Sequence, residues 1–304
     1  MINLKMSKAL LVDVGGTNIR YAIANNLDED ISDINKSSFN EKNFENLLQK
    51  LIKDNNIDTL IISIAGPKIN NSITMTNRNY TFNSDKIKSK FNLQKCIILN
   101  DWEAIAHSFN FISKDIRYIK KGSKFNDTKL FLGPGTGLGA ALSIGNQIVL
   151  PTEIGNTTNS NSYLHKNYDI ELDKNSVLEN LVSGSALSEI YESKTSLKIS
   201  SEEVFEKFNT KDHAAIKVID GFIKSLAETL SDLALTFLPG DEILLAGSLM
   251  RSLFPVINEK DFTEAFIGTK NGIHKELLEK ISIGVIMKEK TPLYGNFNLF
   301  KNLN

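Results

Sequence analysis

Residues 13–20, with the sequence DVGGTNIR, join the end of one predicted strand to the start of the next through a glycine turn. The apolar run at 9–14 predicts a buried β-strand, and residues 18–24 resume the same kind of pattern. Gly15 and Gly16 allow the backbone to turn tightly and to bring its N–H groups close to an anion. We therefore expect a β-hairpin whose turn binds phosphate. A plain hairpin turn capped by Asp13 is the alternative.

A second stretch repeats this design at residues 133–139, with the sequence GPGTGLG. It follows a predicted strand at 129–132 and precedes another at 140–143. A flexible surface loop is the alternative, but so many glycines between two apolar strands favour close approach by a ligand. Neither glycine stretch has the Walker pattern or the dinucleotide-binding fingerprint. The repetition suggests two α/β domains with a cleft between them.

The remaining pattern favours strands and helices that alternate along the chain, which is typical of an α/β protein. Residues 214–237 carry an apolar stripe at helical spacing. Ser84 is a plausible N-cap for a short helix, and Pro292 suits the first turn of a C-terminal helix. The other predicted strands are 59–64, 96–99, 241–246 and 281–287, and the other predicted helices are 43–53, 84–91 and 102–109.

Composition limits the kinds of partner that we expect. The chain has 304 residues, which is enough for two domains, and a formal net charge of -1, which gives no broad basic surface for nucleic acid. Cys96 is the only cysteine, so no internal disulfide and no multi-cysteine metal site can form, and its apolar strand favours a core position. We expect a cytoplasmic protein without a membrane segment, because no apolar run is long enough to span a bilayer.

Several polar residues stand where predicted strands or turns end. Asp101, in the sequence LNDW at 99–102, could accept a proton from a substrate hydroxyl, or it could N-cap the following helix. Glu153 and Glu179 could accept hydrogen bonds from adjacent sugar hydroxyls, or they could face solvent. The small residues at 246–248 could let a base or ribose pass against bare backbone, or they could form a tight packing turn.

Taken together and in this order, these stretches resemble the bacterial glucokinase family. The resemblance implies an ATP-dependent sugar kinase with a two-domain actin-like ATPase fold, which is related to the ribonuclease H fold. It runs from Leu11 to about Tyr294. It rests on residues 13–20 (DVGGTNIR), 65–67 (AGP), 75–77 (MTN), 99–101 (LND), 135–139 (GTGLG), 150–153 (LPTE), 179 with 183–184, and 246–247.

The resemblance also implies a role for individual residues, with ATP and Mg²⁺ as cofactors and a hexose, chiefly glucose, as the substrate. Asp101 would be the catalytic base, and Asp13 would hold Mg²⁺ through water. The sugar would be bound by Asn77, Asn100, Asp101, Glu153, Asn156 and Glu179. The nucleotide would be bound by Asp13, Gly15, Gly16, Thr17, Asn18, Gly135, Thr136, Gly137, Gly247 and Ser248. The expected domains are 1–106 with 291–304, and 107–290, and a homodimer is the common state of the family.

The chain departs from the family pattern at a few positions. Where the family has glutamate-glycine-glycine-histidine, this sequence has EIGN at 153–156. Asn156 can form hydrogen bonds but cannot carry charge, and Ile154 would crowd the sugar pocket. Tyr80 replaces a usual tryptophan, and Ser248 replaces a glycine. These changes leave kinase chemistry intact, but they make a kinase for mannose or an N-acetylhexosamine the first alternative to a glucokinase. A sugar-binding protein without catalysis is the second alternative, and a phosphatase or ATPase of the same superfamily is the third.

Overall fold

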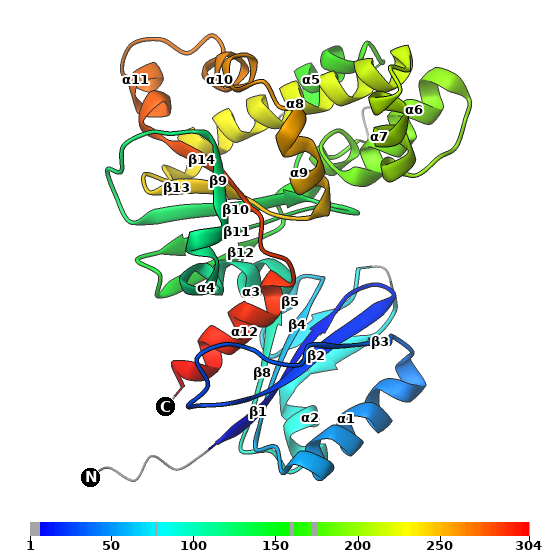
Figure 1. Cartoon of the computed structure of the whole chain (residues 1–304), viewed down its shortest axis with the longest axis vertical. Coiled ribbons are helices and arrows are strands. Elements are labelled where there is room, and N and C mark those ends of the chain that lie inside the picture. Colours follow the sequence, from blue (N-terminus) through cyan, green and yellow to red (C-terminus); the bar gives the residue numbers. More distant parts are fainter. Residues whose placement is uncertain (1–6, 77, 159–160, 172–175, 304) are drawn as a thin grey trace. The chain divides into compact units, whose positions relative to one another are not determined.

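The computed structural model describes residues 7–76, 78–158, 161–171 and 176–303. The chain divides into two compact units (Figure 1). Unit 1 comprises Met1–Lys114 and Lys288–Asn304, and unit 2 comprises Asp115–Met287. From the sequence we predicted domain boundaries after residues 106 and 290. In the structure, the contacts between residues divide the chain after residues 114 and 287. Unit 1 is therefore made from both ends of the chain.

Unit 1 is built on a five-stranded sheet with the order β3-β2-β1-β4-β8. The strands are β1 (Lys8–Val14), β2 (Asn18–Asn25), β3 (Asn35–Ser38), β4 (Thr59–Ile64) and β8 (Lys95–Asn100). β1 and β2 form the antiparallel hairpin predicted from the glycine turn, whereas β1, β4 and β8 run parallel. Val14 pairs with Ile64, and Ile64 pairs with Asn100. The glycine turn and the start of the next helix after β8 therefore lie at the same edge of this sheet.

Helices cover both faces of the unit 1 sheet. They are α1 (Glu41–Asn55), α2 (Ser84–Lys90), α3 (Asp101–His107), α4 (Phe109–Ile112) and α12 (Thr291–Lys301), with η1 at Ser113–Asp115. Leu10 and Val12 pack with residues of α1 on one face, and Leu11 packs with residues of α3 and α12 on the other. Successive side chains of β1 point to opposite faces of the sheet, so they pack into two separate hydrophobic cores. Figure 1 shows the two sets of helices on opposite sides of the sheet.

Close backbone contact fixes α12 against α3 and β1. A Cβ at Gly295 would lie 1.7 Å from the Ala104 carbonyl oxygen, so only glycine lets the two helices approach this closely. The Asn296 side chain donates a hydrogen bond to the Val12 carbonyl at 2.9 Å. The Pro292 that we expected to open a C-terminal helix stands in its first turn.

A small sheet completes unit 1, with strands β5 (Lys68–Ile69), β6 (Ser72–Thr74) and β7 (Thr81–Asn83). It leads into α2, where the prediction of Ser84 as N-cap is wrong. Asn83 is the N-cap, and its side chain accepts a hydrogen bond from the Lys86 N–H at 2.9 Å. The amide oxygen of Asn83 competes well for this position because asparagine is among the best N-caps.

Cys96 is partly buried, and burial raises its pKa to about 12, which fits a packing role.

Unit 2 repeats the strand arrangement of unit 1 in a six-stranded sheet with the order β12-β11-β10-β13-β14-β9. The strands are β9 (Ile116–Lys120), β10 (Thr128–Pro134), β11 (Leu138–Ile144), β12 (Ile148–Thr152), β13 (Glu242–Leu245) and β14 (Ser282–Ile286). β10 and β11 form an antiparallel hairpin around the second glycine turn, and β10, β13 and β14 run parallel. The second glycine turn therefore also lies at the carboxyl end of parallel strands.

The long helix α8 (His213–Phe237) is the centre of the unit 2 core. Asp212 caps its first turn, and Leu238 ends it in a left-handed conformation. The other helical segments are η2 (Ile154–Asn156), α5 (Asn161–Leu164), η3 (His165–Tyr168), η4 (Leu178–Asn180), α6 (Gly184–Thr195), α7 (Ser201–Asn209), α9 (Ser248–Leu253), η5 (Phe254–Val256), α10 (Glu259–Ile267) and α11 (Gly272–Lys280). Within the described ranges, no helix has both the length and the apolar character needed to cross a bilayer.

Candidate active site

The first glycine turn of unit 1 is closed by its own polar groups. The Gly15 N–H donates to the Asn18 carbonyl at 2.9 Å, and the Asn18 side chain donates to the Thr17 hydroxyl oxygen at 2.9 Å. Thr17 therefore accepts one hydrogen bond and keeps its own hydroxyl hydrogen as a donor. A Cβ at Gly16 would meet no protein atom within 4 Å. Packing within the protein thus does not explain this glycine, whereas approach by a ligand would.

Asp13 lies at the end of β1 and is only 6% exposed. Its Oδ2 is 3.1 Å from Arg20 Nη1, and its Oδ1 accepts a hydrogen bond from the Ser63 hydroxyl at 3.4 Å. Burial raises the pKa of Asp13 above its ordinary value, and the contacts with Arg20 and Ser63 offset only part of this rise. Magnesium is usually held by one or two carboxylates together with waters and substrate phosphates. Since no cluster of three metal-binding side chains occurs among the described residues, Asp13 fits such a contact and not a closed metal cage.

Asp101 opens α3, directly after β8. Its Oδ1 accepts a hydrogen bond from the Trp102 N–H at 3.0 Å, and its side chain is partly exposed. The alternative that Asp101 is the N-cap of this helix is wrong, because Asn100 takes that position. The chain thus places a partly exposed carboxylate at the sheet edge that also carries the first glycine turn.

Asn100 holds this helix start in place with its whole side chain. Its Oδ1 accepts from the N–H groups of Trp102 and Glu103 at 2.8 and 3.3 Å, and its Nδ2 donates to the Gly66 carbonyl at 2.9 Å. Asn100 is only 5% exposed. One further Nδ2 hydrogen remains for a sugar hydroxyl, so any contact with substrate would be made by a rigidly held amide.

Glu103 completes the helix start, although we predicted no role for it from the sequence. Its Oε2 accepts from the Asn100 N–H at 3.1 Å, and both of its carboxylate oxygens lie 3.1 Å from Lys68 Nζ. Asn100 and Glu103 therefore form a reciprocal capping box that an ion pair anchors to β5. The signal was present, because a glutamate three residues after an asparagine is the sequence pattern of a capping box.

Two acidic residues approach each other in unit 2. Glu179 lies in η4, and its Oε2 accepts from the Leu138 N–H at 3.2 Å. A Cβ at Gly137 would lie 2.5 Å from that oxygen, and a Cβ at Gly155 would lie 3.0 Å from it. Gly137, which we expected to bind nucleotide, therefore has a clear structural purpose: it leaves room for the Glu179 carboxylate.

Glu153 stands between β12 and η2, next to this carboxylate. Partial removal from water raises its pKa, and the negative charge of Glu179 raises it further. Ile154, which we expected to crowd the sugar pocket, is partly buried and packs against the unit 2 core. Asn156 is exposed, and its N–H donates to the Glu153 carbonyl at 3.1 Å. Asn77, also expected to bind sugar, lies outside the described residues.

A cavity of about 560 Å³ in unit 2 brings together residues from four separated stretches. Its lining includes Gly135, Thr136 and Ser248, which the sequence analysis assigned to nucleotide binding. It also includes Ser185 on α6 and Phe205 on α7, for which the sequence carried no motif. Polar serines with an aromatic wall suit a small molecule that has both polar and flat apolar parts.

Backbone geometry shapes this cavity. The Gly184 N–H, at the start of α6, donates to the Gly135 carbonyl at 2.7 Å, and a Cβ at Gly184 would lie 2.9 Å from that oxygen. Gly247 has φ of +112°, where other residues are strained, and it turns the chain from β13 into α9. Gly247 itself is not part of the lining, although the adjacent Ser248 is.

Known proteins resemble this chain over nearly its whole length. A glucokinase from Campylobacter jejuni subsp. doylei is 28% identical, and the match covers 96% of this chain and 94% of that protein. The crystal structure of a glucokinase from an Antarctic psychrotroph has a TM-score of 0.79 at 20% identity and covers 97% of this chain and 99% of that one. A ROK family glucokinase from Streptomyces griseus, solved with glucose and AMPPNP, has a TM-score of 0.65 at 18% identity, with coverage of 97% and 98%.

These structural similarities confirm the predicted fold class. The family model for glucokinase matches residues 10–303, a range that contains both glycine turns and Asp101. The chain therefore belongs to the glucokinase family.

Proposed function

We propose that this protein transfers the γ-phosphoryl group of ATP to the 6-hydroxyl of glucose. The observation that carries the proposal is the shared edge of the unit 1 sheet, where the first glycine turn and Asp101 follow the ends of parallel strands. Ligands of open α/β sheets bind at such carboxyl ends. Membership in the glucokinase family supports a sugar kinase, and the Streptomyces griseus glucokinase bound to glucose and AMPPNP supports the two substrates.

Asp101 acts as the general base in this mechanism. Its carboxylate accepts the proton of the 6-hydroxyl while the oxygen attacks the γ-phosphorus, and the bond from that phosphorus to the ADP oxygen breaks. The Trp102 N–H holds one carboxylate oxygen at 3.0 Å. The capping box of Asn100 and Glu103 fixes the backbone below it. Asp101 is therefore oriented before the sugar binds.

The two unit 2 carboxylates select the sugar by accepting hydrogen bonds from its other hydroxyls. Glu179 is held by the Leu138 N–H and by the space that two glycines leave. Glu153 lies close enough for its pKa to respond to Glu179. A carboxylate can accept two hydrogen bonds at once, so each residue suits a pair of adjacent hydroxyls.

The phosphates are bound by donors of the two glycine turns, and the adenosine is bound in the unit 2 cavity. Thr17 keeps a hydroxyl hydrogen for an anion, and Thr136 and Ser248 line the cavity. When Mg²⁺ is bound, it offsets the negative charge of the phosphates. Asp13 would hold that ion through water, from its fixed position beside Arg20 and Ser63.

A panel of sugars in a coupled ADP-release assay tests the proposal. We expect kcat/KM for glucose to exceed that for mannose, N-acetylglucosamine and N-acetylmannosamine. 6-Deoxyglucose, which lacks the accepting hydroxyl, should inhibit competitively without releasing ADP. A higher kcat/KM for another hexose would assign the enzyme to that sugar. Asn156, which stands where the family has histidine, is the reason to test other hexoses. ADP release that no hexose stimulates would exclude kinase activity and favour a sugar-binding protein.

A further inference from the structure

Arg78 lies in the segment between β6 and β7 and is attached to the first glycine turn. Its Nε donates to the Gly16 carbonyl at 3.1 Å. Its guanidinium carbon lies 5.3 Å from the centre of the Phe39 ring, within the range of a cation–π contact. Phe39 is itself bound to the turn, because its N–H donates to the Thr17 carbonyl at 2.9 Å. The arginine is therefore held by two groups that belong to the turn or are bonded to it.

The charge of Arg78 is not neutralised within the described part of the chain. The other arginine near this turn, Arg20, forms an ion pair with Asp13 at 3.1 Å. Arg78 forms no ion pair with any described carboxylate, and the only hydrogen bond from its side chain to a described residue is the one from Nε. Both Nη groups thus remain as donors next to Gly16 and Thr17, which are exposed. An anchored cation beside exposed turn residues is an arrangement that suits an anion.

We propose that Arg78 binds the terminal phosphates of the nucleotide through its Nη groups. This inference rests on the proposed function. The guanidinium forms paired hydrogen bonds with phosphate oxygens, and the two contacts that anchor it reduce the side-chain entropy lost on binding. A purely structural arginine would only clamp the turn. That clamp uses Nε alone and would not need the two Nη groups as free donors beside an exposed turn.

Calorimetric titration of the whole chain with AMPPNP and AMP, in the presence of Mg²⁺, tests the inference. For Arg78→Gln we expect the Kd of AMPPNP to rise about 10- to 100-fold, because a hydrogen bond between charged groups contributes about 1.5–3 kcal/mol. The Kd of AMP should change less than about twofold, since AMP lacks the terminal phosphates. Arg117→Gln is the matched control, because it removes the same charge from an exposed position on β9. It should leave both affinities unchanged.

Further variants separate phosphate binding from clamping. Phe39→Leu removes the ring contact and keeps the charge, so AMPPNP affinity should stay within about threefold of the parent. Arg78→Lys keeps the charge without the planar fork and should fall between the parent and Arg78→Gln. An unchanged AMPPNP affinity in Arg78→Gln would overturn the inference, as would equal weakening of AMPPNP and AMP.

Two further arms identify the phosphate and separate this inference from the proposed function. Titration with glucose 6-phosphate tests the product: weakening confined to that ligand would contradict the assignment to the nucleotide. The parent protein is assayed for glucose-dependent ADP release in parallel. Failure of that assay with normal AMPPNP binding would reject the proposed function and leave the role of Arg78 to be decided by the titrations.

Discussion

The carboxylate of Glu179 occupies space that Gly137 and Gly155 leave open. A methyl group at Gly137 would lie 2.5 Å from Oε2 and would displace the carboxylate, and one at Gly155 would also lie 2.5 Å from the Leu138 carbonyl oxygen, which belongs to the backbone. The Leu138 N–H fixes the same oxygen. Partial removal from water raises the pKa of Glu153, and the negative charge of Glu179 raises it further. At the residue scale, the proposed sugar contacts are therefore sensitive to pH.

We expect KM for glucose to rise as the pH falls. The pKa of Glu153 is raised, so its carboxylate becomes protonated at a higher pH than an ordinary glutamate and loses acceptor capacity. KM measured from about pH 8 to about pH 5 should increase toward acid. Glu153→Gln should raise KM about tenfold at neutral pH and flatten its acid dependence. The same acid profile in the parent and in Glu153→Gln would reject this role.

At the scale of elements, the start of α3 depends on a reciprocal cap and an ion pair. Glu103 is only 9% exposed, and it serves both the Asn100 N–H and the Lys68 ammonium. A buried group with two partners stabilises the helix start more than a surface ion pair would. Asp101 is the first residue of α3. The position of the proposed base therefore depends on how firmly the start of this helix is held.

Glu103→Ala should lower the unfolding free energy by about 1–2 kcal/mol and also lower kcat, because it removes the cap and leaves Lys68 without its partner. Glu103→Gln should be milder, since its amide oxygen can still accept from the Asn100 N–H. Urea unfolding and steady-state kinetics on both variants measure the two effects. If the alanine and glutamine variants behave alike in kcat, the cap does not position Asp101.

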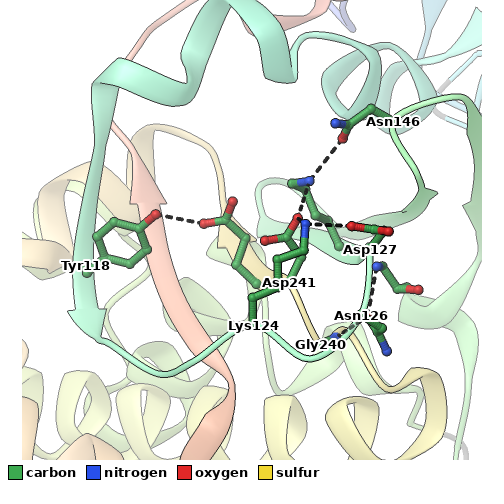
Figure 2. Close-up of polar contacts among 10 residues, drawn as sticks. Tyr118, Lys124, Asn126, Asp127, Asn146, Gly240 and Asp241 are labelled. Atoms are coloured by element: carbon green, nitrogen blue, oxygen red, sulfur yellow. Dashed lines mark hydrogen bonds and ion pairs between the residues drawn. The ribbon is translucent and has the colours of Figure 1, made fainter.

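A second polar cluster lies at the amino ends of β10 and β13, which is the end opposite to the second glycine turn (Figure 2). Lys129 is only 3% exposed, and its Nζ lies 2.6 Å from Asp241 and 3.0 Å from Asn146. Tyr118 donates to Glu242 at 2.9 Å. Burial and the Glu242 charge raise the pKa of Tyr118 to about 12. This cluster stabilises the strand ends of unit 2.

Lys129→Met should lower the unfolding free energy by about 1–3 kcal/mol. Removing one member of a buried ion pair costs up to about 5 kcal/mol, but here Lys124 still pairs with Asp241. Values of kcat and KM should not change, because the cluster lies away from the glycine turn. Lys124→Met, at an exposed position, is the matched control and should have a much smaller effect on stability. A loss of activity in Lys129→Met without a loss of stability would contradict this assignment.

At the scale of the whole molecule, the hairpin around a glycine turn that recurs in both units could be predicted from the sequence. It could be predicted because it depends on short stretches of consecutive residues. The strand at Thr59–Ile64 agrees with its prediction, and α8 begins one residue before the predicted 214. Apolar runs and glycine turns carry this information in consecutive residues. The same is true of the two hairpins around the glycine turns, which recur in both units.

What the sequence could not predict depends on residues that are distant along the chain. Phe205 and Ser185 line a cavity only because α6 and α7 bring them to the second glycine turn. Arg78 meets Gly16 across 62 positions. The structural purpose of Gly137 became visible only with Glu179 beside it. None of these contacts leaves a local pattern in the sequence. The glycine motif therefore indicated only nucleotide binding for Gly137, and no motif indicated a role for Arg78.

The central claim is that Asp101 accepts the proton of the sugar hydroxyl, and Asp101→Asn tests it most directly. We predict that kcat for glucose falls by about 100-fold or more, since asparagine cannot take the proton. The Kd of glucose, measured by titration, should stay within about twofold of the parent, because the amide keeps the size and an acceptor oxygen. A variant with near-parental kcat would contradict the account.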